Sequence, residues 1–257
     1  MKIVIFGGTT EGRELSERLI DAGAEVTVCV ATQYGEEEQG QVPGVMTHVG
    51  PLTAEAKQRL LRDAALCVDA THPYADRVTA SVRAACTAAG VEYLRLLRKA
   101  SEIPDAVTVE NAAAAAAWLR EREGRVLLTT GAKELAAYAG LDPERLVPRV
   151  LPSHESLAAC EALGIPHRNI IAMQGPFSEE LNAAVIRQYR VRYVVTKDGG
   201  GPGGFPEKAA AAKETGAQLI VLRRPADSGF PFDEVLRLCI TRLSDANKRK
   251  MKKGETT

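Results

Sequence analysis

A turn rich in glycine and threonine follows the first apolar run of the chain, and its residue types suit the binding of a phosphate. It reads Gly7-Gly8-Thr9-Thr10-Glu11-Gly12-Arg13. The dinucleotide fingerprint G-x-G-x-x-G would place glycine at 7, 9 and 12, and here Thr9 stands in the middle. Free backbone amides and the partial positive charge at a helix start bind anions, and threonine hydroxyls add donors. The turn predicts a nucleotide-phosphate site, with a glycine turn that binds no ligand as the alternative.

The end of the second apolar run bears on which dinucleotide would bind. That run ends at Ala31 and continues as Thr32-Gln33-Tyr34-Gly35, so the acidic residue that usually binds the adenosine ribose of NADH is missing. The acidic residues 36–38 would repel a 2′-phosphate if they faced it, but we expect them at the surface. The choice between NADPH and NADH stays open.

Polar residues also follow the third buried run, in the order Asp69-Ala70-Thr71-His72-Pro73-Tyr74-Ala75. Open α/β sheets bind ligands at the carboxyl ends of their strands, and Pro73 fits the first turn of a following helix. We therefore predict that Thr71, His72 and Tyr74 contact the cofactor. His72 is the candidate catalytic residue, although contact without proton transfer and a structural role are both open.

Two turns in the second half of the chain carry further anion-binding groups. The segment Thr129-Thr130-Gly131-Ala132-Lys133-Glu134-Leu135 repeats the spacing of residues 9–15, where a strand again meets a helix. It predicts a second anion-facing helix start, with a chance repeat as the alternative. A glycine-rich loop with Lys197 follows a later buried run, at 195–204. Such a loop suits a large anionic ligand, and a surface connector is the alternative.

The elements that must position these turns follow two alternating patterns. Short β-branched runs typical of buried strands occur first at 3–6, 26–30 and 66–68. Helical periodicity lies between and after them, at 11–22, 53–63 and 75–89. The pattern weakens over 99–105. It then resumes with an alanine-rich helix and with apolar runs at 126–129, 146–147, 170–173, 193–196 and 219–222.

This alternation is the βαβ rhythm of a parallel sheet. We predict an α/β fold of two Rossmann-like, doubly wound parallel-sheet domains with a cleft between them. Residues 1–98 form the nucleotide-binding domain, residues 99–245 form the second domain on the substrate side, and residues 246–257 form a flexible basic tail.

Composition excludes several classes of protein. The 33 basic and 33 acidic residues give no net charge, which argues against a nucleic-acid partner. The five cysteines are scattered without a CxxC pair, and no histidine has metal-ligand spacing, so no metal site is predicted. No apolar stretch approaches the roughly 18 residues of a membrane span, and the first residues read as a strand rather than a signal peptide. We expect a cytoplasmic protein whose oligomeric state is open.

At these residues the sequence resembles the precorrin-6A reductase family, whose members act on the metal-free or the cobalt-containing macrocycle. The matching segments run in order and at family spacing over nearly the whole chain. They are 7–15, 69–75, Leu94-Arg95-Leu96-Leu97-Arg98, 129–131, Gly175-Pro176-Phe177, Val195-Thr196-Lys197-Asp198 and Val221-Leu222-Arg223-Arg224-Pro225.

The resemblance implies reduction of precorrin-6A, or cobalt-precorrin-6A, by hydride from a nicotinamide during corrin-ring biosynthesis. NADPH is the implied cofactor, with NADH possible. The implied partner is a tetrapyrrole polycarboxylate, which needs cationic donors such as Lys133, Arg149, Lys197, Arg223 and Arg224. We assign the substrate to Thr130, Gly131, Lys133, Lys197, Asp198, Gly199 and Arg223.

Two other functions remain as alternatives. A non-catalytic NAD(P)-binding regulator of the atypical short-chain dehydrogenase type would explain the first glycine turn, but not the cationic loops of the second half. An α/β transferase that uses another nucleotide, such as a methyl donor, would share the fold. Turnover separates the reductase from the regulator, and competition between NADPH and S-adenosylmethionine separates it from the transferase.

Overall fold

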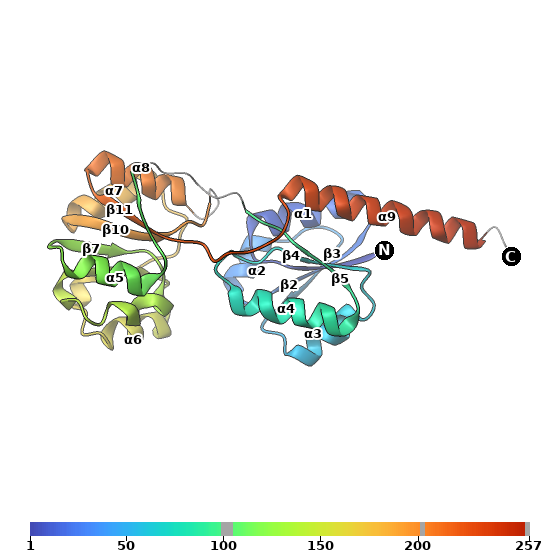
Figure 1. Ribbon diagram of the computed structural model, residues 1–257, viewed down its shortest axis with the longest axis horizontal. Helices are drawn as coiled ribbons and strands as arrows, with labels where there is room; N and C mark the ends of the chain where they lie inside the picture. The colour runs from blue at the N-terminus through green and yellow to red at the C-terminus, as the bar shows by residue number, and fades with distance from the viewer. Residues whose placement is uncertain (99–104, 201–203, 255–257) are drawn as a thin grey trace. The chain divides into compact units, whose positions relative to one another are not determined.

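The computed structural model describes residues 1–98, 105–200 and 204–254, with side chains up to residue 248. The chain forms two compact units (Figure 1). Unit 1 comprises Met1–Lys99 and Pro225–Thr257, and unit 2 comprises Ala100–Arg224. Each unit is a parallel β-sheet between layers of helices, which confirms the prediction of two Rossmann-like α/β domains.

The sheet of unit 1 has the order β3-β2-β1-β4-β5, so the chain reverses direction across the sheet between β1 and β4. Its strands are β1 Lys2–Phe6, β2 Glu25–Val30, β3 Val45–Val49, β4 Leu66–Asp69 and β5 Glu92–Arg95. Its helices are α1 Thr10–Asp21, α2 Gln33–Gln39, α3 Ala54–Leu61, α4 Asp76–Ala89 and α9 Phe232–Gly254.

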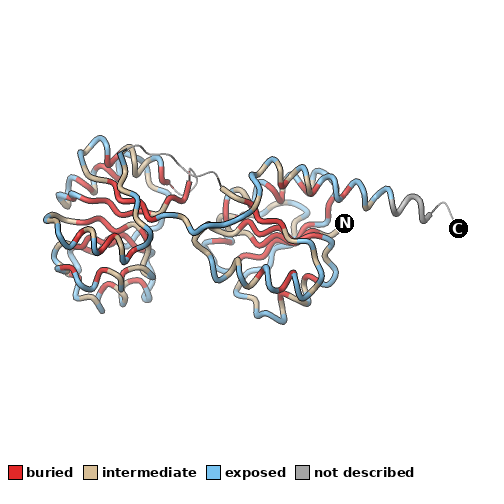
Figure 2. The backbone as a smooth tube through the Cα atoms, viewed as in Figure 1, coloured by how far each residue is buried: buried red, intermediate tan, exposed pale blue. Residues whose placement is uncertain are grey.

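Alternation along the central strands of unit 1 explains why both faces of its sheet are covered. In β1, Ile3 and Ile5 pack with α1 and α9, whereas Val4 and Phe6 pack with α3 and α4. A strand buried on both faces must be apolar throughout, which is why β1 reads as an unbroken apolar run. Figure 2 shows this burial along the central strands of each unit.

The sheet of unit 2 has the order β6-β11-β10-β7-β8-β9, with a corresponding reversal between β7 and β10. Its strands are β6 Val107–Val109, β7 Arg125–Leu128, β8 Leu146–Val150, β9 Ile171–Ala172, β10 Val191–Lys197 and β11 Gln218–Leu222. Its α-helices are α5 Ala112–Arg120, α6 His154–Glu161, α7 Glu179–Gln188 and α8 Phe205–Thr215. Three 3₁₀ helices complete it: η1 Ala132–Tyr138, η2 Pro143–Arg145 and η3 His167–Asn169.

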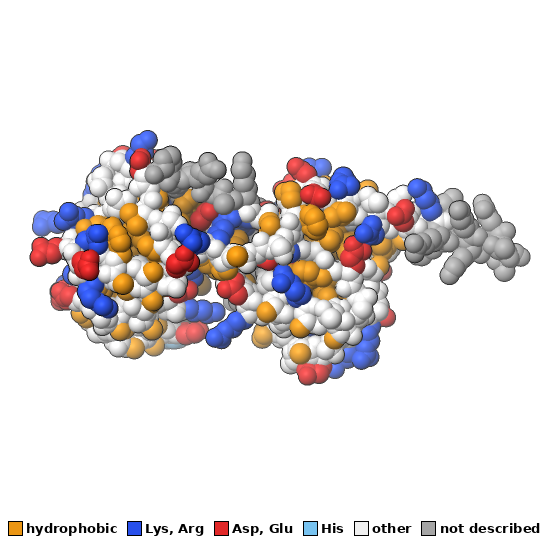
Figure 3. Space-filling model, in the orientation of Figure 1, with side chains coloured by type: hydrophobic (Ala, Val, Ile, Leu, Met, Phe, Trp, Pro, Cys, Tyr) orange, Lys and Arg blue, Asp and Glu red, His pale blue; other side chains and the backbone are white. Residues whose placement is uncertain are grey.

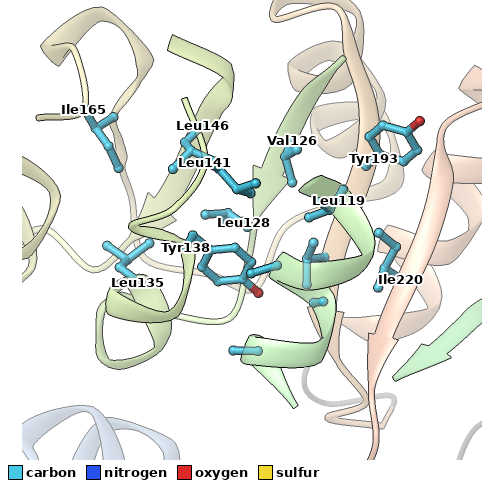
Figure 4. Close-up of a cluster of buried hydrophobic side chains, with 14 of the residues drawn as sticks. Leu119, Val126, Leu128, Leu135, Tyr138, Leu141, Leu146, Ile165, Tyr193 and Ile220 are labelled. Carbon is cyan, nitrogen blue, oxygen red and sulfur yellow. The ribbon is translucent and has the colours of Figure 1, made fainter. Parts of the chain in front are cut away.

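One face of this second sheet packs against α5, η1 and α6, and the other packs against α7 and α8. Figure 4 shows the first of these cores, in which Leu119 of α5 and Tyr138 of η1 meet Leu128 and Ile220 of the sheet. Each unit therefore has its own hydrophobic core. The turns after β1, β4, β7 and β10, described above from the sequence, lie at the carboxyl ends of these strands.

The predicted second domain over 99–245 is wrong beyond Arg224, because the chain from Pro225 returns to unit 1. Within α9, Val235, Cys239 and Leu243 are buried in the unit 1 core. The periodicity of α9 predicts an apolar face, but no local pattern in the sequence indicates which of the two sheets that face packs against. The boundary predicted at residue 99 and most of the connector at 99–105 lie outside the described residues.

The predicted flexible tail at 246–257 is helical as far as Gly254, where α9 ends, and residues 255–257 lie outside the described part of the chain. Among the helices that the structure describes, none combines the length and the apolar character needed to cross a membrane. Lys and Arg side chains lie among Asp and Glu over the visible face of each unit, in keeping with the zero net charge (Figure 3).

Candidate functional site

Thr9 organises the turn between β1 and α1. Its backbone is extended, with φ −137° and ψ 154°, and its Oγ1 accepts a hydrogen bond from Gly12 N at 3.2 Å as the N-cap of α1. The same hydroxyl donates to the carbonyl oxygen of Ala70 at 2.8 Å, at the end of β4. The hydroxyl expected to contact a phosphate is therefore used within the protein. This role explains why threonine occupies the middle glycine position of the fingerprint.

Glycine is required on both sides of this cap, for different reasons. Gly8 has φ +93°, and a Cβ there would lie 3.4 Å from the Cα of Gly35 at the start of α2. A Cβ on Gly12 would lie 3.3 Å from the Cβ of Ala70, so glycine lets α1 start close to the end of β4. This close approach accounts for glycine at position 12.

The start of α1 is suited to an anion. The amides of Gly8, Thr9, Thr10 and Glu11 donate to no acceptor among the described residues. Unsatisfied N–H groups at the N-terminus of a 12-residue helix carry its partial positive charge. The pyrophosphate of a dinucleotide supplies acceptors that such amides require.

A hollow of about 110 Å³ adjoins this turn within unit 1. Its walls come from the ends of the strands and from α3 and α4, and most of them are apolar. The lining residues are Phe6, Gly7, Cys29, Val30, Ala31, Gly50, Pro51, Leu52, Lys57, Thr71 and Val78. Lys57 is buried, and its Nζ donates to Ser81 Oγ at 2.7 Å. An apolar hollow beside unsatisfied amides offers one surface for an apolar ring and another for an anion.

The other side chains of the predicted turn engage neighbours within unit 1. Thr10 Oγ1 donates to Glu38 Oε2 at 3.2 Å, and Glu11 pairs with Arg98. Arg13 Nε lies 3.0 Å from Glu17 Oε1, one turn along α1, where both side chains are about half exposed. The structure thus places the backbone of Gly7–Gly12 at the start of α1, while the Arg13 guanidinium pairs with Glu17 along the helix surface.

A buried ionic network holds the end of β4, where Thr71 and His72 follow. Asp69 is fully buried, and its Oδ1 accepts from Arg95 Nη1 at 3.0 Å and from Thr71 Oγ1 at 2.6 Å. Arg95 Nη1 also donates to the carbonyl oxygen of Thr71 at 2.9 Å, and its Nε donates to Asp227 Oδ2 at 2.6 Å. The returning segment therefore supplies a counterion that fixes the β4 turn.

Tyr93 completes this network by donating to Asp69 Oδ2 at 2.9 Å. Burial, and then the neighbouring Asp69 carboxylate, raise the pKa of the Tyr93 phenol. The sequence did not reveal that Arg95 and Asp227 hold the turn after β4. An arginine inside a buried strand was the available signal for Arg95, because such a charge needs a partner. Asp227 gave no local signal, since its partners are more than 130 residues away.

His72 and Tyr74 lie together in the turn after β4. Tyr74 N donates to His72 Nδ1 at 3.3 Å, and the two ring centroids are 5.6 Å apart with an angle of 32° between the planes. Both residues are partly exposed. The arrangement places an imidazole at the carboxyl edge of the sheet, as predicted, and the chemical role of that imidazole remains a prediction.

In unit 2, the carboxyl ends of the neighbouring strands β7 and β10 bring together Thr130, Gly131, Lys197, Asp198 and Gly199. Lys197 Nζ lies 2.9 Å from Glu134 Oε1. Asp198 is buried, and its Oδ1 accepts from Gly200 N at 3.1 Å and lies 2.9 Å from Arg224 Nη2. Residues 201–203 of the predicted glycine loop lie outside the described residues.

The expected second anion-facing helix start is wrong in its geometry. The segment after Gly131 is the seven-residue 3₁₀ helix η1, and no side chain caps it. Thr129, the counterpart of Thr9, donates its hydroxyl to Val195 O at 2.9 Å on β10 instead. A short 3₁₀ helix has a weaker dipole than α1. The segment with the repeated spacing therefore does not form a second helix start like that of α1.

Two further predicted substrate residues lie away from the pair of strand ends. Lys133 is exposed on η1, and Arg223 follows β11, where it pairs with Glu110 beyond the end of β6. Arg149 on β8 differs from these cations because it is buried, and its guanidinium donates to Asn182 Oδ1 at 2.8 Å.

Comparison with protein families and curated proteins identifies relatives along most of the chain. The family model described as precorrin-6x reductase CbiJ/CobK matches residues 2–240. The chain is 36% identical over 233 residues to the cobalt-precorrin-6A reductase of Methanothermobacter thermautotrophicus, covering 88% of this chain and 77% of that protein. It is 36% identical to the enzyme of the same name from Salmonella typhimurium, covering 87% of each.

The metal-free branch is also represented. The chain is 28% identical to the precorrin-6A reductase of Rhodobacter capsulatus, covering 88% of both proteins. A solved structure described as CobK precorrin-6A reductase superposes with a TM-score of 0.72, covering 93% of this chain and 96% of that one at 23% identity. At that identity the superposition bears on the fold alone.

Proposed function

The chain belongs to the precorrin-6x reductase family, CbiJ/CobK, and we propose that it reduces precorrin-6A or cobalt-precorrin-6A with a nicotinamide dinucleotide as the hydride donor. Family membership makes it a reductase of corrin-ring biosynthesis. The identity of the donor and the metal content of the macrocycle belong to the proposal. The two 36%-identical relatives described above are both cobalt-precorrin-6A reductases, so the cobalt form is the first substrate to test.

The observation that carries the cofactor assignment is the set of free amides at Gly8, Thr9, Thr10 and Glu11, beside the apolar hollow. These amides would bind the pyrophosphate, and the hollow would take the adenosine. Because Thr9 is hydrogen bonded to Gly12 and Ala70, the amides are held in position before the ligand arrives. Such preorganisation lowers the cost of binding.

NADPH is the preferred donor in this proposal, and NADH is the second candidate. Glu38 of α2 accepts from Thr10 at the start of α1, but residues 31–35, directly after β2, contain no carboxylate, and Thr32 there caps Gly35 N at 3.1 Å. The usual hydrogen-bond acceptor for the ribose 2′-hydroxyl of NADH is therefore missing. Calorimetric titration of the protein with each dinucleotide tests the preference directly.

When bound, a reduced nicotinamide supplies the hydride, and the residues of this chain position it and supply its surroundings. The Asp69–Arg95 ion pair fixes Thr71, and the turn that follows carries His72 and Tyr74. We assign these three residues to the cofactor, with His72 holding the reacting ring. Reduction also needs one proton, which solvent supplies if His72 acts by positioning alone.

The substrate side of the proposal rests on the carboxyl edge of unit 2. Lys197 stands at the end of β10 beside Thr130 and Gly131, and Asp198 is fixed by Arg224. A cation at this edge suits the carboxylate side chains of a tetrapyrrole, because charge-assisted hydrogen bonds are the strong ones. Lys133 and Arg223 stay in the assignment as outer contacts.

An anaerobic assay with both macrocycles tests this function. We expect oxidation of the nicotinamide at 340 nm only when precorrin-6A or its cobalt form is present, with a product two hydrogens heavier by mass spectrometry. Binding of the dinucleotide without oxidation would favour the non-catalytic regulator. Displacement of NADPH by S-adenosylmethionine would favour a transferase.

A further inference from the structure

Arg149 is a buried cation whose hydrogen-bonding capacity is mostly unused. It lies near the carboxyl end of β8, and the residue is only 6% exposed. Of its five N–H donors, one meets Asn182 Oδ1 at 2.8 Å, and the others have no acceptor among the described residues. Buried guanidinium groups are normally satisfied by several acceptors, so this group has donors available for a ligand.

Arg149 also has no carboxylate within ion-pair distance in the described part of the chain. The contrast with unit 1 is direct, since the similarly buried Arg95 pairs with both Asp69 and Asp227. Burial lowers the pKa of the Arg149 guanidinium to about 10, which leaves it charged at neutral pH. The Arg149 nitrogens that lack an acceptor are not among the fully buried unpaired atoms of the described residues, so an anion from solution can reach them. A largely buried charge without a counterion is costly, and an anionic ligand would offset that cost.

The guanidinium is held in a fixed position. Its Cζ lies 4.1 Å from the centroid of the Phe177 ring. Asn182, which accepts from Arg149, donates through Nδ2 to the carbonyl oxygens of Phe177 at 3.3 Å and Ser178 at 2.7 Å. The stacking and the shared Asn182 leave the rotamer little freedom, so the unused N–H groups form a preorganised donor set.

A second cation lies close by on α8. Burial lowers the pKa of Lys208 to about 8, and the charge of Arg149 contributes to that shift, while Glu207 opposes it. Arg149 lies near the carboxyl end of β8, and Lys208 lies in the first turn of α8, which follows β10. Both therefore lie at the carboxyl edge of the sheet, where β7 separates β8 from β10.

We propose that Arg149, with Lys208 beside it, binds a carboxylate of the macrocyclic substrate as a separate subsite from Lys197. This inference rests on the proposed function, because it names a tetrapyrrole polycarboxylate as the source of the anion. The planar fork of arginine matches a carboxylate in two parallel hydrogen bonds. The subsite would set the orientation of the macrocycle, while the residues of unit 1 bind the cofactor.

The test compares Arg149→Gln, Arg149→Lys, Lys208→Gln and Arg187→Gln in the full-length protein. Arg187 is the matched control, because it is an exposed arginine on α7 of the same unit and pairs with Glu214. Circular dichroism and thermal unfolding establish that each variant is folded. Anaerobic absorbance titrations with precorrin-6A and its cobalt form then give tetrapyrrole affinity, and calorimetry with NADPH gives cofactor affinity.

We expect Arg149→Gln to weaken tetrapyrrole binding by about tenfold or more and to leave NADPH affinity unchanged. Arg149→Lys should recover part of the loss, since it keeps the charge without the fork. Lys208→Gln should weaken binding by a smaller factor, and it provides the test if Arg149→Gln does not fold. Arg187→Gln should match the wild type.

Unchanged tetrapyrrole affinity in folded Arg149→Gln overturns the subsite. Equal loss of both affinities with a lower unfolding temperature assigns Arg149 a structural role and overturns it as well, and loss of NADPH affinity alone moves the anion to the cofactor. Wild-type protein that binds neither macrocycle contradicts the proposed function itself, and the subsite with it.

Discussion

The hydroxyl of Thr9 donates to the carbonyl oxygen of Ala70 at 2.8 Å and accepts from the amide of Gly12 at 3.2 Å. One side chain thus joins the start of α1 to the end of β4, the two places where unit 1 would contact a dinucleotide. Thr9, at the fingerprint position that lacks glycine, thus connects the two turns that we propose bind the cofactor.

Replacing Thr9 by valine should therefore affect both stability and binding. Thr9→Val removes the helix cap and leaves the carbonyl of Ala70 unsatisfied, so we expect a loss of about 2 kcal/mol in the free energy of unfolding. Dinucleotide affinity should fall, and Thr9→Ser should retain both properties. Urea denaturation and calorimetry measure the two effects.

Thr53 provides the control for Thr9. It caps α3 through Ala56 N at 3.2 Å at an exposed position, so Thr53→Val removes a cap without touching the β4 turn. Thr53→Val should lower stability by about 1 kcal/mol and leave dinucleotide affinity intact. Equal dinucleotide affinities for Thr9→Val and the wild type would show that the Thr9 hydrogen bonds do not support cofactor binding.

Gly8→Asp should abolish most of the cofactor affinity. The substitution strains a residue with φ +93° and brings a carboxylate to the amides that would bind the pyrophosphate. We expect at least about tenfold weaker dinucleotide binding, or some 1.4 kcal/mol. Gly23→Asp is the matched control, since Gly23 also has positive φ but lies at the other end of α1 with open space around it. Unchanged affinity in folded Gly8→Asp would move the cofactor elsewhere.

Lys197→Ala should reduce tetrapyrrole affinity while leaving dinucleotide affinity nearly intact, because Lys197 belongs to unit 2. Removal of the lysine also leaves Glu134 without that partner, which adds repulsion toward a carboxylate ligand. Lys213→Ala, at an exposed position on α8, is the control for loss of a lysine. Parallel loss of both affinities in Lys197→Ala would indicate misfolding or a wrong assignment of the substrate to this edge.

His72→Asn should slow single-turnover reduction without abolishing it, and the pH profile should keep its shape. Asparagine can still accept from the Tyr74 amide as His72 Nδ1 does, so the turn should remain folded. A positioning residue leaves no titration of its own in the rate, whereas a proton donor does. Complete loss of reduction with both ligands still bound, together with loss of a wild-type titration step, would make His72 the acid.

The thiol of Cys29 should be inert in the folded protein although Cys29 lines the hollow beside the β1–α1 turn. Burial raises its pKa from 9.0 to about 12, so the reactive thiolate is scarce at pH 8. Iodoacetamide at pH 8 should leave Cys29 unmodified in the native state and alkylate it in urea. Because the unfolded thiol ionises first, the stability contributed by Cys29 should fall as pH rises from about 9 toward 12. Rapid native labelling would contradict this burial.

Much of the fold could be predicted from local sequence. The apolar runs of β1, β2 and β4 could be recognised as strands, because strands buried on both faces are apolar along most of their length. The glycine turn at 7–13 could be recognised from its residue types. The edge strands β3 and β6 were not predicted. β3 is mostly exposed along Val45–Val49, and β6 has three residues, so neither shows an apolar run long enough to recognise.

Long-range contacts account for the rest. The return of the chain to unit 1 depends on Asp227 meeting Arg95 and on α9 covering a sheet formed some 200 residues earlier, and no periodicity encodes those partners. The repeat at 129–135 was misleading for a related reason. Its spacing copies residues 9–15, but the hydroxyl of Thr129 bonds to Val195 on the neighbouring strand, so the helix cap is lost.

The direct test of the central claim follows the hydride itself. The protein is incubated anaerobically with cobalt-precorrin-6A, or with precorrin-6A, and NADPH carrying deuterium at either face of the nicotinamide C4. The reductase proposed above predicts that one label is transferred to a macrocycle carbon, and that the same reaction in heavy water with unlabelled NADPH adds one solvent deuterium. A dinucleotide that binds but transfers no deuterium to either macrocycle would contradict the account.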